Sequence, residues 1–355
     1  MADPLNLTPE QARLALKTWL AERGEPAYRA KQILPRLWRR PVGSWEEATE
    51  LPAGLRRDLQ AAFPLHRLKL AARQVSKDGT EKYLWDLGDG EAVESVLIPE
   101  GKRRTLCISS QVGCALGCVF CATGRMGFRR NLSTAEIVAQ VREVVLLDRA
   151  LTPTNVVFMG MGEPLLNWEP VDAALTILNG ADGFGIGARH ITVSTVGIVP
   201  ALAKLAARSE QFRLALSLHA PTPELRHELM PIEKKYALPH VLNALKQFRR
   251  RVTLEYVLIG GQNDGLEQAD RLAELARPLG ALVNLLPLHP GGAPDLSPSP
   301  RTQMLAFERR LKRHAVEAVL RRSRGLDISA ACGQLRVELE ARRRKVHAQE
   351  HARVE

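Results

Sequence analysis

Long apolar runs are missing from this chain of 355 residues. No uninterrupted run approaches the ~20 residues that a helix needs to span a bilayer. The start, MADPLNLTPEQARLALKTWL, also lacks the basic-then-apolar order of a secretory signal. We therefore expect a cytoplasmic protein without a membrane partner. Disorder is not expected either, because 45% hydrophobic and 25% charged residues are ordinary for a globular protein. The length allows one large α/β domain with an accessory segment, or two medium domains.

Cysteine is scarce, and three of the five cysteines fall within eight residues, CALGCVFC. This distribution does not resemble a disulfide framework, and in a reducing compartment it favours metal binding or catalysis. Cys114, Cys118 and Cys121 stand on a glycine-bearing loop after an apolar run. Structural zinc nearly always has four ligands, so zinc would need Cys107, Cys332 or a histidine as the fourth. An iron–sulfur cube also usually takes four thiolates, and three would leave one iron open to a substrate or cofactor.

Acidic residues are outnumbered, 39 against 50 Lys and Arg, which gives a net charge of +11. The excess is clumped in PRLWRR, KQFRRRV, FERRLKRH, LRRSRG and ARRRK. A solvated, arginine-rich surface explains any single run. The five runs together favour a polyanionic partner, and nucleic acid is the natural one.

The apolar pattern divides the chain into four segments. Residues 1–65 are expected to form a basic helical domain, where Thr8 and Gln11 have the spacing of a capping box. Residues 66–100 alternate with period two around KDGT and GDGE, which predicts a short antiparallel β segment. Residues 101–330 contain six strand-then-helix units, typical of a parallel α/β sheet wound as an open sheet or a barrel. The helices are expected near Ser133, Asn167, Pro200, Pro239, Gly265 and Arg301. Residues 331–355 form a basic C-terminal segment with Cys332.

Unusual polar residues stand at the carboxyl ends of the expected strands: Glu163, Ser194, Ser217, His219 and His289. In a parallel α/β architecture this rim carries the chemistry. Before Glu163, Gly162 lets the backbone approach a ligand closely. A lone serine or histidine at a strand end is more often a satisfied structural group. Phe120, beside the third cysteine, can offer an aromatic face to a nucleobase.

The cysteine spacing C-x3-C-x-aromatic-C resembles the signature of radical S-adenosylmethionine (radical SAM) enzymes. The strings LCISSQVGCALGCVFCATGRMGFRRNLSTAEIVAQV, FMGMGEPLLN, HITVSTVGIVPAL, LALSLHAP and DISAACGQL resemble the RlmN/Cfr family of radical SAM RNA methyltransferases, closest to its RlmN branch, over about residues 10–340. The resemblance implies a partial (β/α)6 barrel. It also implies one [4Fe-4S] cluster on Cys114, Cys118 and Cys121, with SAM bound at the open iron.

The resemblance further implies the residues that contact SAM: Gly162, Glu163, Ser194, Ser217, Leu218 and His219. Glu163 would accept a hydrogen bond from the SAM ammonium. The corresponding position in the last barrel strand is also a SAM contact in the family. It is typically asparagine there, whereas this chain has His289, in a loop that also looks shortened.

The implied reaction methylates C2 of an adenosine, a carbon with no lone pair for a direct polar transfer. Cys332 takes a methyl group from one SAM, and a second SAM supplies the radical that abstracts hydrogen from it. The resulting methylene radical adds to the adenine ring and leaves a covalent protein–RNA link. Glu94 removes the ring proton, and Cys107 attacks the sulfur of Cys332 to form a transient disulfide that thiols reduce. Judged by residue type alone, the two cysteines would be inert buried thiols and Glu94 an exposed strand residue.

The implied substrates are 23S rRNA and an adenosine in tRNA anticodon loops, with a flavodoxin-like electron donor and a monomeric enzyme. We expect the N-terminal helical domain and an arginine-rich helix over 301–324 to hold the RNA backbone. Two alternatives remain open on the sequence: a Cfr-like enzyme that methylates adenine C8 with the same residues, and a zinc-stabilised RNA-binding protein without catalysis.

Overall fold

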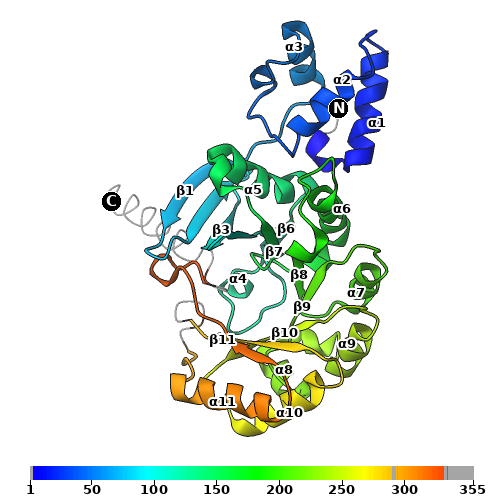
Figure 1. Cartoon of the computed structure of the whole chain (residues 1–355). Helices are drawn as coiled ribbons and strands as arrows, with labels where there is room; N and C mark the ends of the chain where they lie inside the picture. The colour runs from blue at the N-terminus through cyan, green and yellow to red at the C-terminus, as the bar shows by residue number, and fades with distance from the viewer. Residues whose placement is uncertain (1–2, 290–292, 294, 332–333, 335–355) are drawn as a thin grey trace, which may run out of the picture.

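The computed structural model describes residues 3–289, 293, 295–331 and 334. Its centre is a curved ten-stranded sheet in which the strands follow one another in chain order (Figure 1). Strands from β4 onward pair in parallel, whereas β1 to β4 pair antiparallel. The strands are β1 (Lys69–Val75), β2 (Glu81–Asp86), β3 (Ala92–Glu100), β4 (Arg103–Cys107), β7 (Asn155–Phe158), β8 (Ile191–Thr195), β9 (Arg213–Ser217), β10 (Thr253–Leu258), β11 (Leu282–Pro287) and β12 (Ala318–Leu320).

Helices alternate with the parallel strands and cover the outer side of the sheet (Figure 1). The first of them begins at Ser133, whose side chain and that of Glu136 form the expected capping box. Each later helix starts within one residue of its expected position, so the α/β partial barrel predicted from the sequence is confirmed. These helices are α5 (Thr134–Leu147), α6 (Trp168–Asn179), α7 (Val199–Ala206), α9 (Leu238–Leu245), α10 (Leu266–Ala276) and α11 (Arg301–Arg313), with a shorter α8 (Pro223–Leu229) before α9.

The N-terminal helices pack on the barrel through α5. Arg142 of α5 is fully buried and donates hydrogen bonds to the backbone oxygens of Leu37, at 3.1 Å, and Val42. Burial lowers the pKa of this guanidinium to about 10. Apolar residues of both parts form one continuous core. The N-terminal helices are α1 (Pro9–Ala21), which has the expected Thr8–Gln11 capping box, α2 (Arg29–Ile33) and α3 (Ala53–Ala62).

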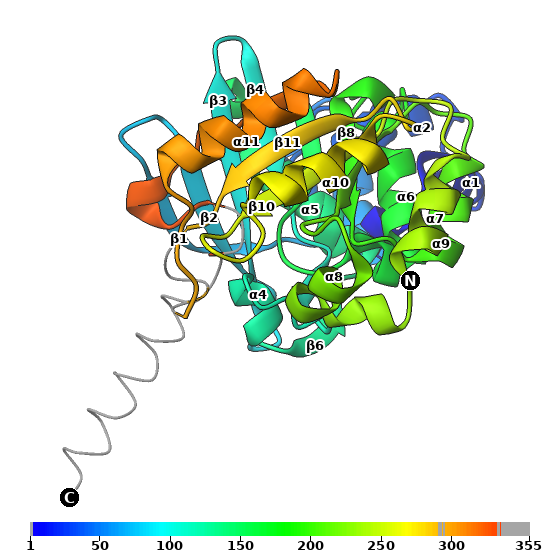
Figure 2. The same cartoon turned by 90° about the horizontal axis from the view of Figure 1, so that it is seen from below.

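The arginine-rich segment 301–324 is only partly helical, which corrects the sequence prediction. Helix α11 ends at Arg313, and Ala315 adopts a left-handed conformation with φ 57°. The chain then forms β12, which pairs in parallel with β11. The open edge of β11 therefore determines the structure here, because its free backbone groups need partners. Figure 2 shows α11 packed beside α10 on the outside of the sheet.

No helix in the described part of the chain combines the length and the apolar character that crossing a bilayer requires.

Candidate active site

The three clustered cysteines lie on a loop held by a short hairpin. Strand β5 (Gln111–Gly113) precedes the loop, and α4 (Ala122–Arg125) and β6 (Phe128–Asn131) follow it. Gly113 has φ +71°, and a Cβ there would lie 1.9 Å from the Gly127 oxygen, so only glycine fits this crossing. The N–H of Cys114 donates to the same oxygen at 3.0 Å. The hairpin thus holds the backbone of Cys114, the first cysteine, in place.

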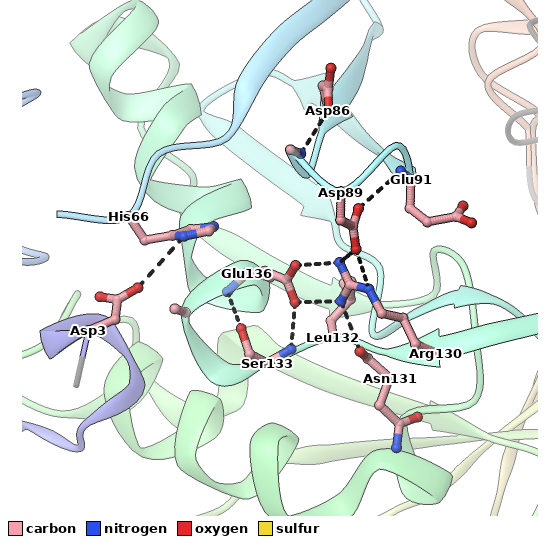
Figure 3. A network of polar contacts seen from close by, with 12 residues as sticks. Asp3, His66, Asp86, Asp89, Glu91, Arg130, Asn131, Leu132, Ser133 and Glu136 are labelled. Carbon is pink, nitrogen blue, oxygen red and sulfur yellow. Dashed lines mark hydrogen bonds and ion pairs between the residues drawn. The ribbon is translucent and has the colours of Figure 1, made fainter. Parts of the chain in front are cut away.

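Arg130 of β6 anchors this hairpin to two other parts of the fold (Figure 3). Its guanidinium donates to both carboxylate oxygens of Glu136, at 2.7 and 2.9 Å, and to Asp89 at 2.7 Å. Burial alone would raise the pKa of Glu136, but the hydrogen bonds from Arg130 and Ser133 outweigh it and hold the pKa below its usual value. The cysteine loop is therefore tied to the N-terminus of α5 and to the turn between β2 and β3.

A cavity of about 270 Å³ lies between the cysteine loop and the carboxyl ends of the parallel strands. It brings together most of the residues predicted from the sequence, although they come from two strands and four loops. Those residues are Cys114, Cys118, Phe120, Cys121, Gly162, Glu163, Ser194, Ser217, His219 and His289. The polar strand ends therefore converge as a parallel sheet predicts.

Glu163 is buried at the centre of this group. One carboxylate oxygen accepts from the N–H of Leu165 at 3.0 Å and the other from the N–H of Val196 at 2.9 Å. Burial raises the pKa of this carboxyl to about 7, against the opposing effect of its hydrogen bonds. The Thr195 side chain also hydrogen-bonds this carboxylate. A carboxylate has about four acceptor positions, so it can still accept a bond from a cationic ligand group. Gly162 beside it has φ +95°, and a Cβ would lie 2.4 Å from that of Gln111.

His219 and Phe120 form one wall of the cavity. Their rings meet edge to face, with centroids 4.6 Å apart. Nδ1 of His219 accepts from the N–H of Val257 at 3.0 Å, so the proton of the neutral ring sits on Nε2. Burial, with a smaller effect from Arg226, lowers the pKa of His219 to about 3. The ring is therefore a fixed, neutral donor, and its backbone is left-handed with φ 57°.

The remaining predicted cofactor contacts differ in how they meet the cavity. Ser194 and Ser217 both line it, with hydroxyl oxygens 3.5 Å apart. The side chain of Leu218 is instead fully buried in the core. His289 lines the cavity, where its Nε2 lies 2.6 Å from the hydroxyl of Ser323, and burial lowers its pKa.

Strand register places Glu94 and Cys107 on one face of the sheet. Leu84 of β2 pairs with Glu94 of β3, and Val96, two residues further, pairs with Cys107 of β4. Paired residues point to the same face, and so do residues two apart on one strand. Lys82 pairs with Val96 and joins them there. All three of Lys82, Glu94 and Cys107 are buried.

The same face continues into the barrel. Cys107 pairs with Val157 of β7, and Val157 pairs with Thr192 of β8. Ser194 lies two residues after Thr192 and lines the cavity. The pairing then carries this face across β9, β10 and β11 to Ser217, Glu255 and Asn284. Glu94 and Cys107 therefore share the concave face that carries the cavity.

Comparison with known proteins identifies the family. The model of the radical SAM superfamily matches residues 108–276. A relative from Gemmatimonas aurantiaca, "Probable dual-specificity RNA methyltransferase RlmN", is 55% identical over 100% of this chain and 98% of its own. A Geobacillus thermodenitrificans relative with the same name is 45% identical over 91% of this chain and 90% of its own. The chain belongs to the RlmN family of radical SAM RNA methyltransferases. Members of the radical SAM superfamily use a [4Fe-4S] cluster and SAM.

A solved structure supports the fold of this RlmN-family enzyme along almost its whole length. The crystal structure of a radical SAM methyltransferase from Sphaerobacter thermophilus superposes with a TM-score of 0.87 and 41% identity. The match covers 95% of this chain and 99% of that one.

The cysteine loop suits the cluster of the RlmN family. Cys114, Cys118 and Cys121 all border one cavity, and a cube takes one thiolate per iron rather than three on one ion. Among the described residues, no three His, Cys, Asp or Glu side chains are grouped closely enough to hold a single metal ion. Burial raises the pKa of Cys114 to about 12 and also raises that of Cys118. Ligation by a metal deprotonates such thiols. The positive charge of the cluster irons would therefore stabilise the thiolates that burial alone disfavours.

Cys332 lies outside the described residues. The two residues that precede it, Ala330 and Ala331, line the cavity.

Two groups of the site in this RlmN-family enzyme were missed by sequence reasoning. Glu255 of β10 is a buried carboxylate on the cavity wall that accepts from Asn284 at 2.9 Å, and burial raises its pKa. An acidic residue inside the apolar run VTLEYVLIGG was a signal that could have revealed it. Lys82 was hidden in an alternating strand pattern. The basic run LRRSRG, which the sequence did indicate, lines the cavity after β12 through Arg321, Arg322, Ser323 and Arg324.

Proposed function

We propose that this enzyme methylates C2 of an adenosine in 23S rRNA, and of an adenosine in tRNA anticodon loops. The observation that carries the proposal is the shared concave face, on which Glu94 and Cys107 lie with the strand-end residues beside the cysteine loop. The two RNA classes are supported by the relatives' description as dual-specificity RNA methyltransferases.

The two cofactors would bind in different parts of the cavity. Cys114, Cys118 and Cys121 would hold the cluster, and Glu163, Ser194, Ser217 and His219 would bind SAM. Together the bound cluster and SAM supply a one-electron cleavage that yields a hydrogen-abstracting 5′-deoxyadenosyl radical. The neutral His219 ring and the hydroxyl groups can orient the adenosyl end, while the Glu163 carboxylate receives the ammonium. Apolar neighbours such as Phe120 and Met230 exclude water from this space.

The chain's own residues then divide the remaining chemistry. The thiolate of Cys332 takes the methyl group of one SAM, and a second SAM is consumed in the same turnover. After the methyl carbon has joined adenine C2, Glu94 accepts the ring proton. The thiolate of Cys107 attacks the sulfur of Cys332, and the bond from that sulfur to carbon breaks with its electron pair going to carbon. A proton then completes the methyl group on adenine C2, and the two cysteines are left as a disulfide. External thiols restore both cysteines.

The RNA would meet a basic rim. Arg321 and Arg322 are exposed and line the cavity with Arg324, where they can contact the phosphates beside an adenosine. An adenine in folded RNA must be extruded to enter a cavity of this depth. The N-terminal helical domain is our second candidate for backbone contacts.

The test uses three variants of the reconstituted enzyme with a 23S rRNA transcript. Cys332→Ala should make no methyladenosine and no covalent adduct, whereas Cys107→Ala should accumulate protein joined to RNA. Cys114→Ala should lose the brown cluster. Mass spectrometry of nucleosides from a deletion strain, with and without this gene, reports the modified carbon and the RNA. A C8 product would favour the Cfr-like alternative. A tightly bound zinc with no SAM-responsive cluster would overturn the proposal that the protein is an enzyme.

We also propose that the enzyme is monomeric and cytoplasmic and, from the family resemblance, that its electron donor is flavodoxin-like. Light scattering tests the monomeric state, and reduction of the cluster by purified flavodoxin tests the electron donor. A dimer or an unreduced cluster would contradict them.

A further inference from the structure

The segment before Cys332 is docked on the turn between β1 and β2. Asp78 of the turn accepts from the N–H of Gly325 at 3.0 Å. In return, Asp327 accepts from the hydroxyl of Ser76 at 2.5 Å and from the N–H of Lys77 at 3.2 Å. Gly325 is left-handed, and a Cβ there would lie 2.7 Å from that of Ala330, so the segment also turns tightly on itself. In Figure 1 this orange segment lies beside the lower ends of the cyan strands.

Lys82 holds the other end of the docked segment. Its Nζ donates to the backbone oxygen of Ser329 at 3.3 Å and lies 3.9 Å from Oε1 of Glu94. The lysine and glutamate side chains are 6% and 2% exposed. One buried ammonium therefore contacts both the proposed base and the backbone three residues before Cys332.

The charge of Lys82 matters because Glu94 is buried. A buried carboxylate without a cation is costly and takes up a proton instead. An ammonium within about 4 Å favours the ionised form, which is the form that can accept the adenine proton. The charge of Lys82 therefore favours the form of Glu94 that can act as a base. The hydrogen bond from Lys82 to Ser329 holds the segment before Cys332 against the Lys82 side chain.

We propose that Lys82 is a positioning residue of the reaction, which couples the base Glu94 to the segment that carries Cys332. This inference rests on the function proposed above. It assigns to the β1–β2 hairpin a part in catalysis, because the hairpin holds the start of the segment through Asp78 and its end through Lys82.

The test compares Lys82→Met with Lys77→Met in the full-length protein. Lys77 is on the same hairpin, its side chain is exposed, and its N–H contact survives the substitution. With reconstituted enzyme and a 23S rRNA transcript, Lys82→Met should release product about tenfold more slowly or worse, because an opposite charge at this distance changes carboxylate ionisation by about 10- to 1,000-fold. Protein covalently joined to RNA should accumulate as in Cys107→Ala. Lys82→Arg should restore release, since a guanidinium can bond both partners.

A second readout does not require turnover. Hydrogen–deuterium exchange of the peptide covering 325–331, in the cluster-free protein, should become about fivefold faster in Lys82→Met, the size expected for the loss of one hydrogen bond. Lys77→Met should leave both measurements at the wild-type level. If Lys82→Met does not fold, Lys82→Gln, which is neutral but polar, takes its place in both assays.

The outcomes separate the two proposals. If Cys107→Ala forms no adduct with RNA, the proposed function fails and the role of Lys82 fails with it. If Cys107→Ala forms the adduct but Lys82→Met matches Lys77→Met, only the inference on Lys82 is overturned. Slow release with unchanged exchange, or faster exchange with normal release, refutes the coupling of base and segment.

Discussion

Glu163 should make the ligand-free protein less stable as the pH rises. Its carboxyl is buried and has a pKa of about 7, against 4.5 without the fold. A carboxyl whose pKa is raised by folding binds its proton more tightly in the native state. The stability that it contributes is therefore complete below pH 4.5 and is lost as the pH rises through 7.

The size of this loss follows from the two pKa values. The full change corresponds to about 3 kcal/mol, of which about 2.5 kcal/mol falls between pH 5 and pH 8. Glu163→Gln has no such titration. Glutamine offers only one acceptor oxygen for the two N–H groups of Leu165 and Val196, which costs about 1 to 3 kcal/mol at every pH. The informative quantity is therefore how the difference in unfolding free energy between the wild type and Glu163→Gln changes with pH.

Urea unfolding at pH 5, 6, 7 and 8, followed by tryptophan fluorescence, measures this difference. The unfolding free energy of the wild type should fall relative to that of Glu163→Gln by about 2.5 kcal/mol across the series. A constant difference, or one that grows with pH, would refute the assignment of a raised pKa. In cluster-loaded enzyme, SAM should restore the lost stability at pH 8, because its ammonium pairs with the ionised form.

Three further substitutions test the frame of the site. Gly162→Ala should weaken SAM binding at least tenfold by isothermal titration while cluster content stays normal, because its Cβ would clash with Gln111. Arg130→Lys should shorten cluster lifetime in a chelator severalfold, since an ammonium cannot make the forked contact to Glu136; an unchanged lifetime would contradict that anchoring. Arg226→Met should cost about 3 to 5 kcal/mol in urea unfolding by leaving Glu233 as an unpaired buried charge, and Arg226→Met/Glu233→Leu should recover most of it.

Local signals explain why the helices and strands could be predicted. The capping boxes at Thr8 and Ser133 determine helix starts through contacts only three residues apart. The alternation of apolar runs predicted the parallel sheet, and the carboxyl ends of its strands predicted that Glu163 and Ser217 would lie on the same rim, where both line the cavity. By contrast, β12 lies in a segment whose composition favours a helix, and only the open edge of β11 makes it a strand.

The contacts of Lys82 could not be predicted because they depend on distant register. The turn between β2 and β3 determines the strand register that brings Glu94 close to Lys82. A shift of this register by one residue would have turned one of the two side chains to the other face of the sheet. The other partner of Lys82, Ser329, is 247 positions away in the chain. Glu255 was missed for a related reason, since its neighbour Asn284 belongs to the next strand of the barrel.

The contact of Gly325 with Asp78 joins two parts of the chain that the ribosome makes at very different times. The two residues are 247 positions apart, so a ribosome that adds about 5 to 20 residues per second completes the hairpin roughly 12 to 50 s before its partner segment exists. The first strands of the sheet and the cysteine loop can fold in that interval, whereas Cys332, the proposed methyl carrier, arrives only afterwards. A nascent chain would therefore hold its cysteine loop well before it holds the proposed methyl carrier.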